Sequence, residues 1–179
     1  VIVDVLMGGP PCQSFSNANK QRKKNDSRDG LYKLFVESIP LFSPKIILIE
    51  NVRGFEKVIP ELEKLVKEKG YSTMVVKLNA RDFGIPQNRS RVFTIGVNQS
   101  HFGKLNSKDV LERIMQRIYD AKSPEKALME AISDLPTLKA STVKNNTSHE
   151  SVENGYTIQK KTSEPSDYVK ELNGNTSPV

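Results

Sequence analysis

The sequence predicts an α/β fold built on a mixed β-sheet, and two patterns support this prediction. Two short apolar runs, residues 1–7 and 45–52, flank a segment whose apolar residues recur at helical spacing. A strand, a crossover helix and a second strand in this order predict parallel pairing. Two further strand-like runs, residues 71–79 and 90–97, are joined by a short loop, which favours an antiparallel pair added to the parallel sheet.

Two helices are expected to connect and cover these strands. The first spans residues 30–42, and Pro40 is expected to bend it near its end. The second is expected to begin near Pro60 and to end at Gly70. The apolar residues that give the two segments their helical periodicity are Leu31, Leu34, Phe35, Ile39 and Phe42 in the first, and Leu62, Leu65 and Val66 in the second.

The character of the chain changes after Val97. An amphipathic helix is predicted from the spacing of Val110, Leu111, Ile114, Met115 and Ile118. A second covering helix is predicted to start with Ser123 as its N-cap and Pro124 behind it. From residue 136 onward the chain is rich in Ser, Thr, Asn and Lys, so much of this tail is expected to be poorly ordered on its own.

Composition narrows the range of functions. The 179 residues suit one compact domain, alone or with a polar appendage, and the net charge of +6 favours a polyanionic partner. A single cysteine cannot form an internal disulfide, and His101 and His149 stand far apart, so we expect a reducing, intracellular compartment and no metal site. No apolar run is long enough to span a bilayer.

The one cysteine, Cys12, lies in the stretch "GGPPCQSFS", just after the first predicted strand. A lone intracellular thiol is most often a buried, inert residue. However, the loop after a strand of an open α/β sheet is a place where ligands bind. Gly8 and Gly9 allow close approach of backbone to a ligand, Pro10 and Pro11 stiffen the segment before the thiol, and the polar residues that follow are unsuited to burial. These flanking residues favour a functional thiol.

Charged residues at the ends of two other strands are candidate partners. Glu50 closes the apolar run "IILIE", at the sheet edge where Cys12 is expected. Its alternative role is that of a capping or ion-paired carboxylate. Arg89 and Arg91 alternate in "QNRSRVF" and are expected to point to one side of an extended segment, where they could hold an anion or a carbonyl oxygen.

Taken in order, "GGPPCQSFS", "IENV" and "QNRSRVF", together with "SRDGLYKLF" and "LNARDFGIPQNR", resemble the DNA (cytosine-5)-methyltransferase family. The resemblance implies a Rossmann-like, S-adenosylmethionine-dependent methyltransferase fold, here incomplete, because the N-terminal cofactor-binding strands and the C-terminal part of the family pattern are missing. Residues 1–136 are expected to be part of the catalytic domain. The "AISDLP" segment resembles the family's entry into its variable DNA-recognition region. Residues 137–179 are therefore expected to be the start of the target-recognition region.

The resemblance also implies the chemistry. Cys12 would add to carbon 6 of a cytosine and thereby activate carbon 5 toward the methyl group of S-adenosylmethionine. Glu50, if protonated, would donate to ring nitrogen 3. Arg91 would contact the carbonyl oxygen of the base, and Arg89 would support the catalytic groups. Asn51 is expected to hold the strand end rather than to react.

Binding residues follow from the same resemblance. Because the target atom is inaccessible within a duplex, the base must be flipped out, and the loop from about Ser14 to Arg28 would close behind it. The expected contacts to DNA are Pro10, Ser16, Lys20 and Arg28, while Lys23 and Lys24 equally suit a solvated basic loop. The expected contacts to S-adenosylmethionine are Pro11 and Leu31.

The resemblance further implies a cytoplasmic, nucleoid-associated enzyme that is monomeric at full length, acts on double-stranded DNA and works beside a cognate restriction endonuclease, without membrane or metal. Two alternatives stay open. Relatives with the same motifs methylate cytosine in transfer RNA, and an inactive nucleic-acid-binding remnant would share the basic loop. Because the glycine-rich cofactor loop is missing, this chain alone is expected to bind S-adenosylmethionine weakly.

Overall fold

The computed structural model describes residues 3–11, 30–102, 105–133 and 165–172. Cys12, Ser16, Lys20 and Arg28 lie outside these ranges. The strands and helices of the described residues are β1 (Val5–Gly8), α1 (Leu31–Phe42), β2 (Ile46–Asn51), α2 (Ile59–Glu68), β3 (Tyr71–Asn79), β4 (Ser90–Asn98), α3 (Ser107–Asp120), α4 (Leu128–Ile132) and α5 (Asp167–Leu172). Two 3-10 turns, η2 (Arg53–Val58) and η3 (Ala80–Asp82), follow β2 and β3.

The four strands form one mixed sheet in the order β1-β2-β4-β3. β1 and β2 are parallel, as the strand–helix–strand pattern predicted, with Gly8 beside Ile49. β4 is antiparallel to both of its neighbours, which confirms the predicted antiparallel pair. The carboxyl ends of β1, β2 and β3 therefore meet the amino end of β4 at a single edge of the sheet.

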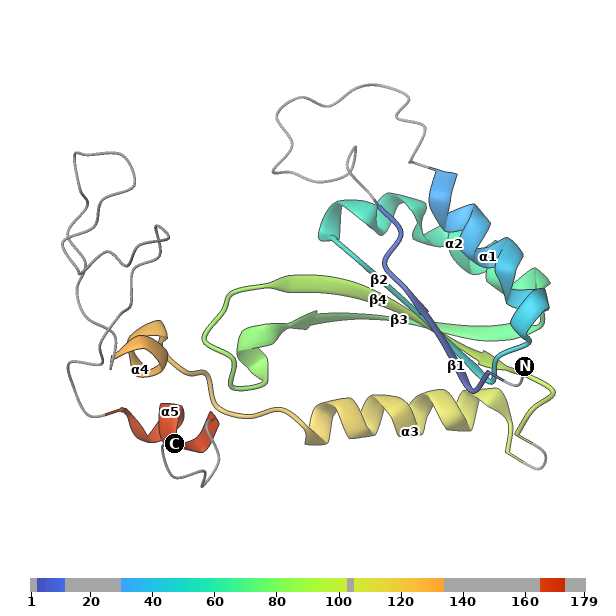
Figure 1. Cartoon of the computed structure of the whole chain (residues 1–179). Helices are drawn as coiled ribbons and strands as arrows, with labels where there is room; N and C mark the ends of the chain where they lie inside the picture. Colours follow the sequence, from blue (N-terminus) through green and yellow to red (C-terminus); the bar gives the residue numbers. More distant parts are fainter. Residues whose placement is uncertain (1–2, 12–29, 103–104, 134–164, 173–179) are drawn as a thin grey trace, which may run out of the picture.

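Helices cover both faces of the sheet (Figure 1). α1 and α2 lie on one face, where odd-numbered residues of β2 such as Ile47 and Ile49 are fully buried. α3 lies along the other face, against even-numbered residues such as Ile46 and Leu48. This alternation follows from the period of two along a strand, and it sends Glu50 and Asn51 to opposite faces.

The α3 face is apolar and partly open beside β1. Val5 and Met7 of β1 are exposed, and a hollow of about 350 Å³ lies between this face and Ile114 and Ile118 of α3. A contiguous apolar surface of this kind is unusual in a solvent-exposed position. Among the residues that the structure describes, no helix is both long enough and apolar enough to cross a membrane.

Two sequence predictions on the C-terminal side are corrected. Ser123 is not an N-cap, because its N–H donates to the carbonyl of Asp82 and the residue pairs with Phe83 in a short bridge. α4 consequently begins only at Leu128, and it lies beside α5 rather than over the sheet (Figure 1). The sequence did not predict α5. Just before this helix, the Ser166 hydroxyl donates to the Glu130 carbonyl of α4.

Gly96 of β4 is expected to be intolerant of any side chain. A Cβ at this position would lie 2.6 Å from Cγ1 of Ile47, which is completely buried. Gly96→Ala should therefore lower the free energy of unfolding by about 1–3 kcal/mol. Gly30→Ala is the control, because nothing lies within 4 Å of its Cβ position, and it should cost about 1 kcal/mol or less. Denaturant unfolding measures both, and equal effects would contradict the tight packing seen at Gly96.

Candidate active site at the strand ends

The candidate site lies where the carboxyl ends of β1 and β2 meet the amino end of β4. β2 ends with Glu50 and Asn51, and β1 leads through Gly9, Pro10 and Pro11 toward Cys12. Asn51 pairs with Val92, which places Arg91 just beyond the end of β2. The register of the sheet thus brings three segments, far apart in sequence, to one edge.

Glu50 and Arg91 form an ion pair. Nε of Arg91 lies 2.7 Å from Oε1 of Glu50, and the side chains are 22% and 38% exposed respectively. Because Glu50 pairs with Phe93, Arg91 stands two residues away on the same face of the sheet, at a diagonal position that long side chains can bridge. Nη1 of Arg91 also donates to the carbonyl of Ser90 at 2.8 Å.

The second carboxylate oxygen of Glu50 lies against the backbone of Gly9. A Cβ built on Gly9 would come within 3.3 Å of Oε2 of Glu50. Glycine therefore lets the chain before Cys12 pass close to this oxygen. Glu50 holds Arg91 with Oε1, and Oε2 accepts no hydrogen bond from any of the described residues.

Asn51 ties the two strand ends together on the opposite face. Its Nδ2 donates to the carbonyl of Pro10 at 3.2 Å, and its Oδ1 accepts from the N–H of Val52 at 2.9 Å. Only 3% of Asn51 is exposed. The sequence analysis expected Asn51 to hold the strand end, and these two hydrogen bonds are how it does so.

Arg89 has different surroundings from Arg91. It precedes β4 and is exposed, and its side chain makes no ion pair or hydrogen bond with any residue in the described part of the chain. Its backbone is held instead, because its N–H donates to Oδ1 of Asn79. Among the described residues, Arg91 has a carboxylate partner and the Arg89 side chain has none, while the predicted convergence of the two arginines stays a prediction.

Asn79, at the end of β3, organises the β3–β4 connection. Oδ1 accepts from the N–H groups of Arg81 and Arg89, while Nδ2 donates to Asn88 and Ser90. The sequence analysis used "LNARDFGIPQNR" for its resemblance but gave Asn79 no role. The sequence did hold one indication of this role. An asparagine before a turn commonly forms hydrogen bonds from its side chain to nearby backbone.

Of the other predicted site residues, the structure describes some and not others. Pro10 is half-buried, Pro11 is exposed, and Leu31 is half-buried at the first turn of α1. The expected nucleophile Cys12 and the expected DNA contacts Ser16, Lys20 and Arg28 fall outside the described residues. Within the described ranges, no group of three or more His, Cys, Asp or Glu residues could hold a metal ion.

A hollow of about 170 Å³, with charged and apolar walls, adjoins Arg91. Its walls include Arg53, Glu56 and Lys77, and Nζ of Lys77 lies 2.9 Å from Oε2 of Glu56. Each of its three basic side chains lies within ion-pair distance of a carboxylate, Arg53 and Lys77 of Glu56 and Arg91 of Glu50. The hollow is lined by Arg53, Glu56, Lys77, Leu78, Asn79, Asp82, Ser90, Arg91 and Val92.

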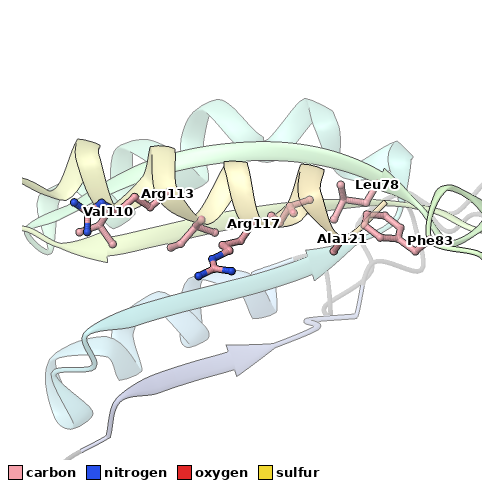
Figure 2. Close-up of a pocket in the computed structure, with 8 residues that line it drawn as sticks. Leu78, Phe83, Val110, Arg113, Arg117 and Ala121 are labelled. Atoms are coloured by element: carbon pink, nitrogen blue, oxygen red, sulfur yellow. The ribbon is translucent and has the colours of Figure 1, made fainter. Parts of the chain in front are cut away.

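A larger groove of about 450 Å³ lies between α3 and the end of β3 (Figure 2). Its walls are mainly apolar, and Leu78 and Phe83 close one end, while Arg113 and Arg117 project from α3. None of the predicted catalytic or binding residues lines it. The strand ends, rather than this groove, are therefore the candidate active site.

Comparison with known proteins identifies the family of the chain. The family model of the C-5 cytosine-specific DNA methylase matches residues 2–177. Type II methyltransferase M.DdeI of Desulfomicrobium norvegicum is 36% identical over 148 residues, which cover 77% of this chain and 34% of that protein. Type II methyltransferase M.AgeI of Thalassovita gelatinovora is 38% identical over 150 residues, 75% of this chain and 35% of that protein. The chain thus spans about a third of the length of these curated relatives.

A solved structure supports the fold. The crystal structure of a candidate DNA modification methyltransferase encoded within a prophage of E. coli aligns with a TM-score of 0.56 and 27% sequence identity. The alignment covers 79% of this chain and 39% of that one. It confirms the expected methyltransferase type of α/β fold, present here as a partial domain.

Loss of the Asn79 side chain is expected to loosen the β3–β4 connection. Asn79→Ala removes four hydrogen bonds, two of them to backbone N–H groups, and should lower the free energy of unfolding by about 1–2 kcal/mol. Amide hydrogen exchange should accelerate at Arg81 and Arg89. Asn88→Ala, which removes one partner of Nδ2 only, serves as the control and should leave exchange at both amides unchanged. Unaltered exchange in Asn79→Ala would refute the role given to Asn79.

Proposed function

The chain belongs to the C-5 cytosine-specific DNA methylase family, and on this basis we propose that the whole protein transfers a methyl group from S-adenosylmethionine to carbon 5 of cytosine in double-stranded DNA. The observation that carries the proposal is the Glu50–Arg91 pair at the strand edge beside Gly9, three residues before Cys12. An acid and a guanidinium at this edge, together with the thiol that follows Pro11 in the sequence, are the groups that addition to a cytosine ring requires.

Cys12 supplies the nucleophile. Carbon 5 of cytosine is a poor nucleophile, but addition of the Cys12 thiolate to carbon 6 forms an S–C6 bond and leaves an enamine whose carbon 5 attacks an electrophilic methyl group. Removal of the proton from carbon 5 by a base then expels the thiolate and restores the aromatic ring. Cys12 is regenerated, so the protein is unchanged after each turnover.

Glu50 and Arg91 stabilise the ring during addition. Protonated Glu50 donates to ring nitrogen 3, and Oε2, which accepts no described hydrogen bond, is the oxygen suited to this contact. Arg91 has donors beyond those bound to Glu50 and Ser90, and they suit the carbonyl oxygen of the base. Because Arg91 occupies Oε1 of Glu50 in the structure, we infer that entry of the base rearranges the Glu50–Arg91 pair.

S-adenosylmethionine supplies the electrophilic methyl group when it is bound. Pro11 and Leu31 offer apolar surface at the same edge and suit contact with it. We assign Pro10, Ser16, Lys20 and Arg28 to contact with DNA around a flipped base, and Arg89 to support of the site through its loop.

We further propose that residues 1–136 are part of a catalytic domain and that residues 137–179 begin target recognition. The two relatives described above are Type II methyltransferases, and we extend to this protein a restriction-modification system with a cognate endonuclease. A cytoplasmic, nucleoid-associated monomer suits such a role.

Cys12→Ser in the whole protein should abolish covalent capture of cytosine. A duplex that contains 5-fluorocytosine traps the adduct. Fluorine replaces the proton on carbon 5 that a base must remove before the thiolate can leave. The wild type should form a complex that survives denaturation, in the presence of S-adenosylmethionine, and the serine variant should form none, since an alcohol is a far weaker nucleophile at neutral pH. Binding of the duplex should be retained in a gel-shift assay.

Other outcomes of this capture assay would reject the proposal. Adduct formation by Cys12→Ser at the wild-type rate would exclude Cys12 as the nucleophile. Binding without any adduct in the wild type would identify an inactive nucleic-acid-binding protein. Faster capture of a 5-fluorocytosine transfer RNA than of the duplex would reassign the substrate to RNA.

Glu50→Gln should slow methyl transfer while preserving binding of DNA. Glutamine keeps the shape and a hydrogen-bond donor but cannot transfer a proton, so the single-turnover rate should fall by about a hundredfold to ten-thousandfold. Glu63→Gln is the matched control, because Glu63 accepts from Thr73 away from the site and should leave the rate unchanged. An unchanged rate in Glu50→Gln, together with a lowered melting temperature, would make Glu50 a structural residue.

A further inference from the structure

We propose that Asn51 is a positioning residue that holds the Cys12 segment in place against the end of β2, an inference that rests on the function proposed above. The side chain of Asn51 bridges two chain segments 41 residues apart. One of them is the strand that carries Glu50, and the other is the proline pair that immediately precedes Cys12. Asn51 would thus set the position of the nucleophile relative to the acid.

Both ends of the Asn51 amide are engaged. Nδ2 donates to the Pro10 carbonyl at 3.2 Å, and Oδ1 accepts from the Val52 N–H at 2.9 Å, which fixes the orientation of the amide. With 3% of its surface exposed, Asn51 cannot change partners freely with water. A buried amide with satisfied donor and acceptor is a rigid connection.

The Asn51–Pro10 hydrogen bond lies beyond the last residue pair of β1 and β2. The paired residues of β1 and β2 end at Gly8 and Ile49. Pro10 and Pro11 have no N–H groups, so neither residue can donate a backbone hydrogen bond to β2. The Asn51 bond therefore continues the attachment of β1 to β2 past the last strand pair, up to two residues before Cys12.

The prolines transmit this constraint along the chain. Proline restricts φ to about −65°, so a fixed Pro10 carbonyl limits the directions that the chain can take through Pro11. On the other side of Pro10, Gly9 leaves room for Oε2 of Glu50, because a Cβ there would come within 3.3 Å of this oxygen. The Asn51 bond thus fixes the segment before Cys12 at a point where the Glu50 carboxylate is close to it.

Asn51 cannot perform chemistry on the base itself. Adjacent residues of a strand point to opposite faces, so Asn51 faces the α1 and α2 layer, whereas Glu50 faces Arg91 on the α3 side. Its effect on the reaction must pass through the Pro10 carbonyl. This distinguishes Asn51 from Glu50 and predicts an effect on the rate of adduct formation rather than on affinity for DNA.

The test uses two variants of the whole protein, Asn51→Asp and Asn51→Ala. The first keeps the acceptor for Val52 and loses the donor to Pro10, and the second loses both. At saturating 5-fluorocytosine duplex and well below the melting temperature, both should form the Cys12 adduct roughly tenfold to a hundredfold more slowly, because small misplacements of reacting groups cost this much. Their dissociation constants for the duplex should stay within about twofold of the wild type.

Asn98→Asp is the matched control. Asn98 also ends a strand and also accepts a backbone N–H, that of Ser100 at 3.0 Å, but it lies at the opposite end of the sheet. This substitution should leave the rate of adduct formation unchanged even if it lowers the melting temperature. A merely structural asparagine would behave in the same way.

The outcomes separate this inference from the proposed function. If the wild type forms the adduct and both folded Asn51 variants form it at the same rate, the positioning role is wrong while the proposed function stands. If neither variant folds, Asn51 is a structural residue and the inference is also overturned. If the wild type itself forms no adduct, the proposed function fails, and the positioning role fails with it.

Discussion

The register of β2 with its two neighbours is the constraint on which the candidate site depends. β2 pairs in parallel with β1 on one side and antiparallel with β4 on the other, so one edge of the sheet collects the ends of β1 and β2 and the beginning of β4. A shift of one residue between β2 and β4 would move Arg91 to the opposite face from Glu50 and break their ion pair. The apolar packing of Ile47 and Ile49 beneath α1 and α2 is what holds this register, because a slipped strand would expose these fully buried side chains.

The last two residues of β2, Glu50 and Asn51, have different partners at this edge. Glu50 points to the α3 side and presents its carboxylate to Arg91 and to Gly9, while Asn51 points to the α1 and α2 side and binds the backbone of Pro10. In the account proposed above, one residue acts on the base and its neighbour holds the nucleophile's segment. The alternation of a β-strand is sufficient to explain why two adjacent polar residues have such different surroundings.

Much of the fold followed from the sequence because each element carried a local signal. Apolar runs and helical spacing identified the strands and α1 to α3, and the short loop before Ser90 identified the antiparallel pair. The N-cap prediction at Ser123 was wrong because this residue pairs with Phe83 in a tertiary contact. α5 was missed because it has only six residues within a polar tail, too few to show a helical period. In the site, residue types revealed Glu50 and Arg91. The network of Asn79 could not be predicted, because it depends on where the β3–β4 connection folds back.

The central claim is that this edge places Cys12, Glu50 and Arg91 around one cytosine ring. The most direct test is a crystal structure of the whole protein trapped on a duplex that contains 5-fluorocytosine. The account predicts a bond from Sγ of Cys12 to carbon 6, with Oε2 of Glu50 at hydrogen-bond distance from ring nitrogen 3 and the Arg91 guanidinium on the carbonyl oxygen of the base. A flipped base bound through other side chains, with Glu50 still paired to Arg91 and no bond to Cys12, would contradict it.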